Sequence, residues 1–211
     1  MTKIETQLLH LKKDKKLKKV IEQVGPLSLN KPNADLYGAL IRAIISQQLS
    51  VKAAQTIYNR FIALFKNGYP EAKIILKLSD EKMRAVGLSY QKCGYIKNIA
   101  QYSLTEGLDY KILKQKNNTE LIEHLVKIKG VGQWTVEMLL MFSLGREDVF
   151  PVDDLGIQNG IKKLYALTSE KKELIKDMQE ISKKWQPYCT LACLYIWRFN
   201  ELLEMFSLFY L

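Results

Sequence analysis

The chain has 211 residues, of which 47% are hydrophobic and 26% are charged, and its formal net charge is +10. This is the composition of an ordinary globular protein, and it excludes a disordered chain. Every apolar run is shorter than the roughly 18 residues that a membrane span needs. The basic surplus favours a polyanionic partner, because lysines that neutralise phosphates release condensed counterions. A basic protein without such a partner is the alternative.

The N-terminal segment, MTKIETQLLHLKKDKKLKKV, has charges throughout and no signal-peptide core. We therefore expect the protein in the cytoplasm if bacterial, or in the nucleus if eukaryotic. Three cysteines are too few for a disulfide framework in a chain of this size. The two histidines have no partner at metal-ligand spacing, so we expect buried thiols and no metal site made of side chains.

Helical periodicity predicts almost every element of the chain. Serines stand at the N-cap position of three predicted helices, Ser50, Ser79 and Ser89. Glycines stand at the ends of three, Gly87, Gly107 and Gly145. The predicted helices span residues 34–48, 51–65, 80–86, 90–106, 117–128, 133–144, 154–167, 169–184 and 188–203.

The predicted fold class is all-α, because no stretch alternates apolar and polar residues over strand length. We expect one compact helical protein with two lobes and a cleft between them. Residues 35–150 form one predicted lobe, which includes a helix-hairpin-helix at about 118–145. Residues 1–34 and 151–211 form the other.

The stretch IKGVGQWTVE, residues 128–137, places two glycines directly before an amphipathic helix. Gly130 and Gly132 are expected to adopt left-handed angles and to let a ligand approach the backbone. The free N–H groups and the positive dipole end of the following helix would bind a phosphate. An ordinary tight turn is the alternative. The candidate residues for binding a DNA backbone are Lys129, Gly130, Val131, Gly132, Gln133 and Thr135.

A second candidate site follows in DVFPVDDLGIQNG, residues 148–160, where Pro151 precedes Asp153 and Asp154. An aspartate at this place is commonly a helix N-cap. One carboxylate suffices for capping, so the second would lie on a basic surface beside the hairpin. That placement favours a chemical role for one of the two.

Together with the hairpin and the aspartate, three further stretches resemble the helix-hairpin-helix GPD superfamily of DNA glycosylases. They are RAIISQQLSVKAA (42–54), VGLSYQKCGYIKNIA (86–100) and WQPYCTLACLYIWRF (185–199). Within the superfamily the chain is similar to the alkyladenine branch, the 3-methyladenine DNA glycosylase II type. The resemblance covers about residues 30–200.

The resemblance implies that Asp154 is the catalytic aspartate and that Asp153 caps the helix. A carboxylate stabilises the positive charge that develops on the deoxyribose and orients a water molecule. Trp134 stands where strand-cutting members carry a Schiff-base lysine. The implied protein is therefore a monofunctional, monomeric glycosylase that removes alkylated purines of the 3-methyladenine and 7-methylguanine type from double-stranded DNA.

The implied base pocket has Trp134 and Trp197 as aromatic walls and Tyr37 as a further candidate, since aromatic faces attract a cationic base. A core position is the alternative for Trp197. The nucleotide must be flipped out of the duplex, and Gln48 or Leu49 is the candidate wedge that fills the gap. An ordinary polar loop is the alternative there.

Ser89 and Lys92 are further candidates for phosphate contacts, with a plain N-cap as the alternative for Ser89. The backbone carbonyls of Val126, Ile128 and Val131 are candidates for a Na⁺ or K⁺ ion. We expect no required cofactor and no iron–sulfur cluster, because the four-cysteine pattern is missing.

The chain departs from the family at Cys189, where arginine is common, so one phosphate contact is in question. At 211 residues we also expect no added N-terminal β domain. The alternative functions are a non-catalytic DNA-binding or damage-sensing protein of the same fold, a glycosylase for another lesion class, and a basic scaffold for acidic proteins.

Overall fold

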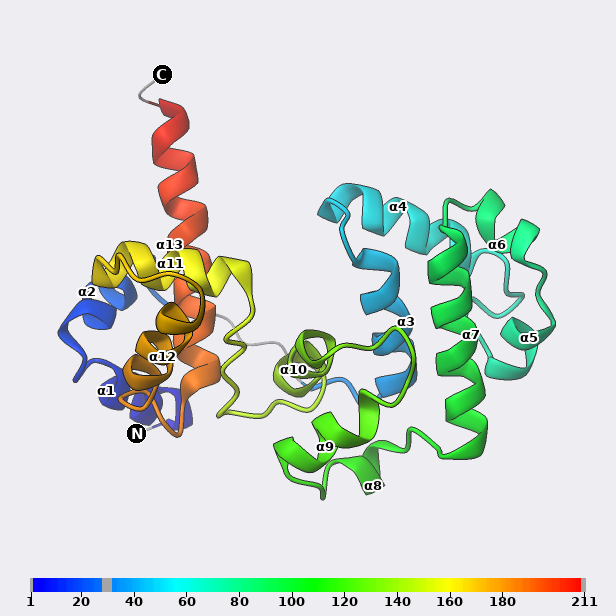
Figure 1. Cartoon of the computed structure of the whole chain (residues 1–211), viewed down its shortest axis with the longest axis horizontal. Coiled ribbons are helices and arrows are strands. Elements are labelled where there is room, and N and C mark those ends of the chain that lie inside the picture. Colours follow the sequence, from blue (N-terminus) through cyan, green and yellow to red (C-terminus); the bar gives the residue numbers. More distant parts are fainter. Residues whose placement is uncertain (1, 28–31, 210–211) are drawn as a thin grey trace. The chain divides into compact units, whose positions relative to one another are not determined.

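The computed structural model describes residues 2–27 and 32–209, and side chains as far as residue 203. All regular elements of these residues are helices, which confirms the predicted all-α class. No helix in these ranges is long and apolar enough to cross a membrane. In chain order the helices are α1 (Lys3–Leu11), α2 (Lys15–Val24), α3 (Leu36–Ser46), α4 (Val51–Ile62), α5 (Ala72–Lys77), α6 (Asp80–Ala85), α7 (Tyr90–Thr105), α8 (Tyr110–Leu113), α9 (Asn118–Leu125), α10 (Gln133–Phe142), α11 (Leu155–Tyr165), α12 (Lys171–Ser182) and α13 (Cys189–Phe209) (Figure 1).

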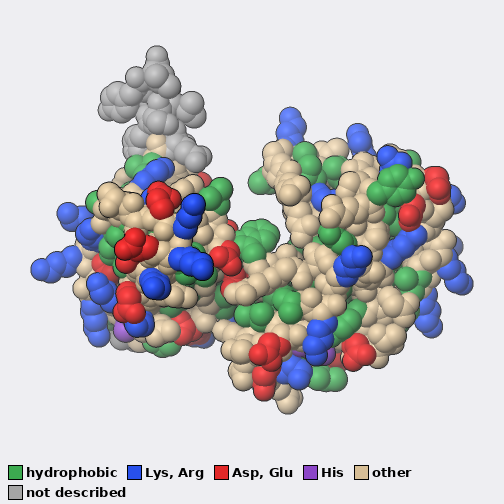
Figure 2. All heavy atoms as spheres, in the orientation of Figure 1, with side chains coloured by type: hydrophobic (Ala, Val, Ile, Leu, Met, Phe, Trp, Pro, Cys, Tyr) green, Lys and Arg blue, Asp and Glu red, His purple; other side chains and the backbone are tan. Residues whose placement is uncertain are grey.

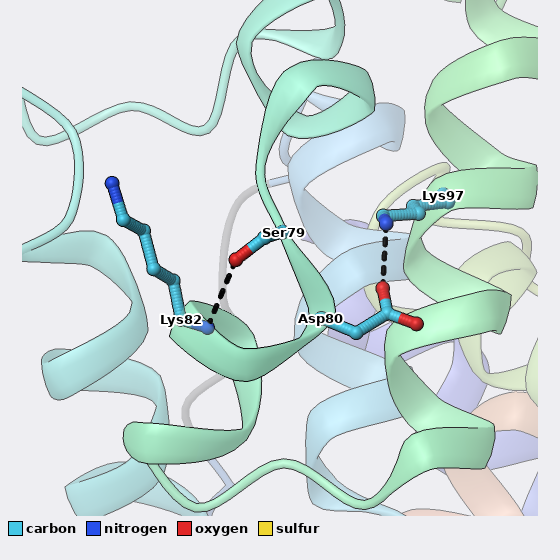
Figure 3. A network of polar contacts seen from close by, with 4 residues as sticks. All are labelled: Ser79, Asp80, Lys82 and Lys97. Carbon is cyan, nitrogen blue, oxygen red and sulfur yellow. Dashed lines mark hydrogen bonds and ion pairs between the residues drawn. The ribbon is translucent and has the colours of Figure 1, made fainter.

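The predicted capping residues are confirmed. Ser50, Ser79 and Ser89 each accept a hydrogen bond from the backbone N–H three residues later. Figure 3 shows the bond from the Lys82 N–H to Ser79 at the start of α6, and beside it the ion pair of Asp80 with Lys97 of α7. No range was predicted for α1, α2, α5 or α8. The helices α5 and α8 have only six and four residues, too few to show a helical period, whereas α6 of six residues was predicted from its serine cap.

The described chain divides into two compact units. Residues 32–144 form the central unit, and residues 1–31 with 145–211 form the terminal unit. The sequence analysis placed the boundaries between the two units after residues 34 and 150, whereas the structure places them after residues 31 and 144. Within the central unit α7 packs against α3, α5 and α6, around buried side chains such as Ile41, Ile96 and Ile99.

In the terminal unit α13 packs against α2 and α11. The helices α11 and α13 approach closely at Gly160, where an added Cβ would overlap Ile196. Asp14 caps α2 and also accepts hydrogen bonds from the Tyr165 hydroxyl at 2.5 Å and from the Trp185 indole at 3.4 Å. These contacts join α2 to α11 and to the segment before α13.

The three cysteines are free and buried, as predicted. Cys189, where the family often has arginine, contacts the Ser182 carbonyl at 3.5 Å inside the terminal unit, and burial raises the pKa of its thiol. In the part of the chain that the structure describes, no three His, Cys, Asp or Glu side chains converge as a metal site.

Candidate active site and nucleic-acid interface

The hairpin between α9 and α10 buries two apolar side chains and exposes Gly132. Ile128 and Val131 are buried, and the Val131 N–H closes the turn by donating to the Ile128 carbonyl at 2.9 Å. Gly132 is the N-cap of α10, and it has no side chain to cap the helix. Since the first N–H groups of a helix have no partner within it, the start of α10 can bind an anion.

The two hairpin glycines have different roles. Gly130 has φ +103°, and an added Cβ would overlap the ring of Tyr95, so both its backbone conformation and its packing require glycine. Gly132 has φ −90° and ψ 168°, which any residue adopts, so the predicted left-handed angle is wrong for this residue. An added Cβ at Gly132 would meet nothing within 4 Å. The space at Gly132 is therefore open to a ligand.

The side chains around the start of α10 differ in exposure. Trp134 is 40% exposed, whereas Thr135 is only 2% exposed. A phosphate contact by Thr135 would therefore use its backbone N–H. The Gln133 amide donates to Glu137 at 2.9 Å. Lys129 is exposed, and its carbonyl accepts a hydrogen bond from Asn98 of α7 at 3.1 Å.

Asp154 is the N-cap of α11, which corrects the prediction that Asp153 caps this helix. The Asp154 Oδ1 atom accepts the Ile157 N–H at 2.8 Å. The Asp154 N–H donates to the Pro151 carbonyl at 3.0 Å, and this turn places Asp153 one residue before the cap, exposed to solvent. The candidate catalytic carboxylate and the capping carboxylate are thus the same group.

Trp197 of α13 contacts this carboxylate directly. Its indole Nε1 donates to Asp154 Oδ1 at 2.9 Å, and the side chain is half-buried. Trp197 is therefore more than a core residue, because its polar edge orients the carboxylate. Its predicted role as a wall of the base pocket stays a prediction.

Two residues that the sequence analysis did not select complete this arrangement. Asn200 donates from Nδ2 to the Gly156 carbonyl at 2.8 Å, so α13 holds the first turn of α11 at two points. A Cβ added to Gly156 would lie 3.1 Å from Asp154 Oδ1 and 3.1 Å from the Trp197 indole. The signal was present in the sequence, because Trp197 and Asn200 share a helical face and Gly156 stands beside Asp154.

Tyr37 lies in α3 of the central unit and is 9% exposed. Its hydroxyl donates to the Pro70 carbonyl at 2.8 Å, and its ring contacts Tyr69. Burial raises the pKa of Tyr37, with smaller contributions from Tyr69 and Asp35. The hydroxyl of Tyr37 therefore serves the packing of the central unit, and its place in a base pocket stays a prediction.

The candidate wedge residues lie in the turn that joins α3 to α4, residues 46–50, named here the wedge loop. Gln48 has φ +58°, an uncommon backbone conformation for a residue other than glycine. Leu49 is 38% exposed, and Val51, the first residue of α4, is 89% exposed. An apolar side chain at the tip of a sharply turned loop fits the wedge prediction better than an ordinary polar loop does.

Ser89 and Lys92 open α7 below this loop. Ser89 caps α7, because its hydroxyl accepts the Lys92 N–H at 3.2 Å. This contact is the plain N-cap that the sequence offered as the alternative for Ser89. The Lys92 ammonium donates to the carbonyls of Ile45 at 2.8 Å and Gln47 at 2.7 Å. Burial lowers the pKa of Lys92. The side chain that was predicted to contact a phosphate is thus directed at the wedge loop.

Comparison with known proteins identifies related sequences and structures. The sequence pattern of the HhH-GPD superfamily of base excision DNA repair proteins matches residues 41–187. The DNA-3-methyladenine glycosylase 1 of Schizosaccharomyces pombe is 38% identical over 208 residues, which are 97% of this chain and 90% of that protein. Its structure in complex with abasic DNA matches with a TM-score of 0.83 over 92% of this chain and 95% of the other. A DNA-3-methyladenine glycosidase from Bacillus halodurans is 39% identical with a TM-score of 0.77, over 90% of this chain and 86% of the other.

Proposed function

Because the chain belongs to the HhH-GPD superfamily of base excision DNA repair proteins, we propose that it is a monofunctional DNA glycosylase. It hydrolyses the N-glycosidic bond of alkylated purines of the 3-methyladenine and 7-methylguanine type in double-stranded DNA. The names and extent of the matching relatives support this substrate class. The observation that carries the proposal is the Asp154 carboxylate on the first turn of α11, oriented by the Trp197 indole.

The reaction needs one carboxylate and one water molecule. As the bond between C1′ and the base nitrogen breaks, the electron pair leaves with the base, and positive charge develops on the sugar. The Asp154 carboxylate stabilises that charge. A water oxygen then attacks C1′, and Asp154 accepts its proton. An alkylated purine already carries a positive charge and leaves as a neutral base, so no strong general acid is required.

Trp134 decides between the two classes of glycosylase. A lysine amine at this hairpin position would form a Schiff base with the sugar and lead to strand cleavage. An indole has no such amine, so the product is an abasic site in an intact strand. The Trp134 ring is 40% exposed, and in this proposal its face meets the cationic base, where cation–π attraction contributes about 0.5 to 2 kcal/mol.

The start of α10 binds a phosphate of the DNA backbone in this proposal. The open space at Gly132 and the exposed Lys129 support that role. The carbonyls of Val126, Ile128 and Val131 are candidates to hold a Na⁺ or K⁺ ion. Of these three carbonyls, that of Ile128 also accepts the Val131 N–H at 2.9 Å, so its second lone pair would be the one to meet the ion. Such an ion would add positive charge beside the phosphate.

The place of action follows from the substrate. A DNA glycosylase acts where chromosomal DNA lies, which is the cytoplasm of a bacterium or the nucleus of a eukaryote. The basic net charge of +10 supports a polyanionic partner.

The test is base release from DNA treated with a simple methylating agent, by the wild type and by Asp154→Asn. Half of each product is treated with alkali before the strands are sized. We expect the wild type to free methylated purines, the strands to break only after alkali, and the variant to be inactive. Strand cleavage without alkali would contradict the role of Trp134. Tight DNA binding without base release would instead identify a damage sensor.

A further inference from the structure

One face of α7 contacts both candidate DNA-binding parts of the central unit, the wedge loop and the hairpin. Lys92 contacts the end of α3 at the wedge loop. Three residues later, the Tyr95 ring lies directly under Gly130 of the hairpin. Asn98 then donates to the Lys129 carbonyl at 3.1 Å. Residues three apart share a helical face, so a single rigid helix connects the wedge loop with the phosphate-binding hairpin.

The Lys92 ammonium donates to backbone carbonyls at the C-terminal end of α3. The last carbonyls of a helix have no partner within it, and a cation at this end suits the helix dipole. The ammonium donates to Ile45 at 2.8 Å, in the last turn of α3, and to Gln47 at 2.7 Å, the first residue after it. Both bonds are partly buried, which explains the lowered pKa of Lys92. Lys92 thus fixes the backbone on the N-terminal side of the loop tip.

The loop tip needs such support. Gln48 holds a left-handed conformation that is unfavourable for a side chain with a Cβ. The Leu49 N–H donates to the Ser46 carbonyl at 3.2 Å, which closes the turn. The Gln47 amide also lies 3.5 Å from the Gly130 carbonyl, a long contact that again joins the loop to the hairpin. A strained turn persists only where its surroundings determine it.

We propose that Lys92 is a positioning residue, which holds the wedge loop in the conformation that inserts Leu49 into the duplex while the hairpin holds the backbone. This inference rests on the proposed function. It also replaces the expected phosphate contact of the Lys92 side chain by a contact inside the protein.

The test compares Lys92→Met, which keeps the length but removes the charge, with Lys92→Arg, which keeps donors. Lys82→Met is the matched control, because Lys82 is an exposed lysine of α6 outside the proposed site. The first measurement is amide hydrogen exchange of the free proteins. We expect faster exchange in residues 46–50 of Lys92→Met alone, with α10 unchanged and with partial recovery in Lys92→Arg.

The second measurement is the rate of 3-methyladenine release from two duplexes, one with the lesion paired and one with it opposite an abasic site. Flipping a paired base costs the most. We therefore expect Lys92→Met to lose about tenfold on the paired lesion and under about twofold on the unpaired one. A phosphate contact would instead weaken binding to both duplexes and lower the salt slope by about one.

Two results would overturn the inference: unchanged exchange in the wedge loop of Lys92→Met, or equal losses on both duplexes. The exchange measurement does not depend on activity. If the wild type released no methylated purine, the proposed function would fail, and the exchange result would still decide whether Lys92 holds the loop.

Discussion

Two helix N-termini, one in each unit, solve the same physical problem in opposite ways. The first N–H groups of α10 and of α11 both need an acceptor. At α10 the N-cap is Gly132, which has no side chain to offer, and the space around it is open. At α11 the N-cap is Asp154, whose carboxylate accepts the Ile157 N–H. The end of α10 has no side-chain cap, whereas the end of α11 is capped by an anion of the protein.

The difference agrees with the separate roles that the proposed function gives to the two ends. An uncapped end with an exposed lysine nearby suits a phosphate, which remains charged throughout. A fixed carboxylate suits a sugar that becomes positive only in the transition state. In the proposed function, phosphate binding therefore belongs to α10 and chemistry to α11, and the variants below test each role separately.

The largest expected effect is on chemistry, from Asp154→Asn. Asparagine is also a good N-cap, so we expect the melting temperature to remain close to that of the wild type. The rate of base release should fall by about a thousandfold, because the amide carries no charge. Thermal melting checks the expected stability, and single-turnover base release on the same samples checks the expected loss of rate. If Asp154→Asn instead lowered the melting temperature strongly and left the rate of base release nearly unchanged, the carboxylate would serve the stability of α11 and not the reaction.

Gly130→Ala should have the next largest effect, on the stability of the central unit. The left-handed backbone and the overlap with Tyr95 are expected to cost about 2 to 3 kcal/mol of unfolding free energy. Gly132→Ala is the matched control, since its Cβ would enter open space, and it should change stability by less than about 0.5 kcal/mol. Chemical denaturation measures both. Equal effects would mean that the two glycines have the same role.

Gly132→Asp gives α10 a charged N-cap residue like the one that α11 has in Asp154. The extended backbone at this residue allows a capping aspartate, so we expect a stability gain of a few tenths of a kcal/mol. DNA binding should weaken about tenfold, because the new carboxylate repels phosphate. Gly132→Ser supplies a cap without charge, and should keep more of the affinity. Binding isotherms at one fixed salt concentration measure the DNA affinity of both variants. Unchanged affinity in Gly132→Asp would show that the start of α10 does not contact DNA.

The smallest expected effect comes from Trp197→Phe, which keeps an aromatic ring but removes the N–H that orients Asp154. The loss of one hydrogen bond to a charged group should slow base release about tenfold or less. Affinity for DNA with an abasic site should remain unchanged. If affinity falls and the rate does not, Trp197 acts as a wall of the base pocket and its hydrogen bond is incidental.

Local features of the fold could be predicted from the sequence. The caps at Ser50, Ser79 and Ser89 are each made within a few residues, so their signals stand in the sequence. The glycine hairpin and the aspartate after Pro151 were found for the same reason. The cap was assigned to Asp153 instead of Asp154, because a one-residue choice depends on the turn that precedes the helix.

The sequence by itself determined the all-α class, the positions of the longer helices, the hairpin and the candidate pair Asp153 and Asp154, of which the family resemblance singled out Asp154. Only the tertiary structure decided which groups serve these features. The bond from Trp197 to Asp154 spans 43 residues, and the bonds from Lys92 to the α3 end span 45 and 47 residues. A helical period states which face of a helix is buried, but not which helix covers it. The orientation of Asp154 and the support of the wedge loop therefore arise from helix packing.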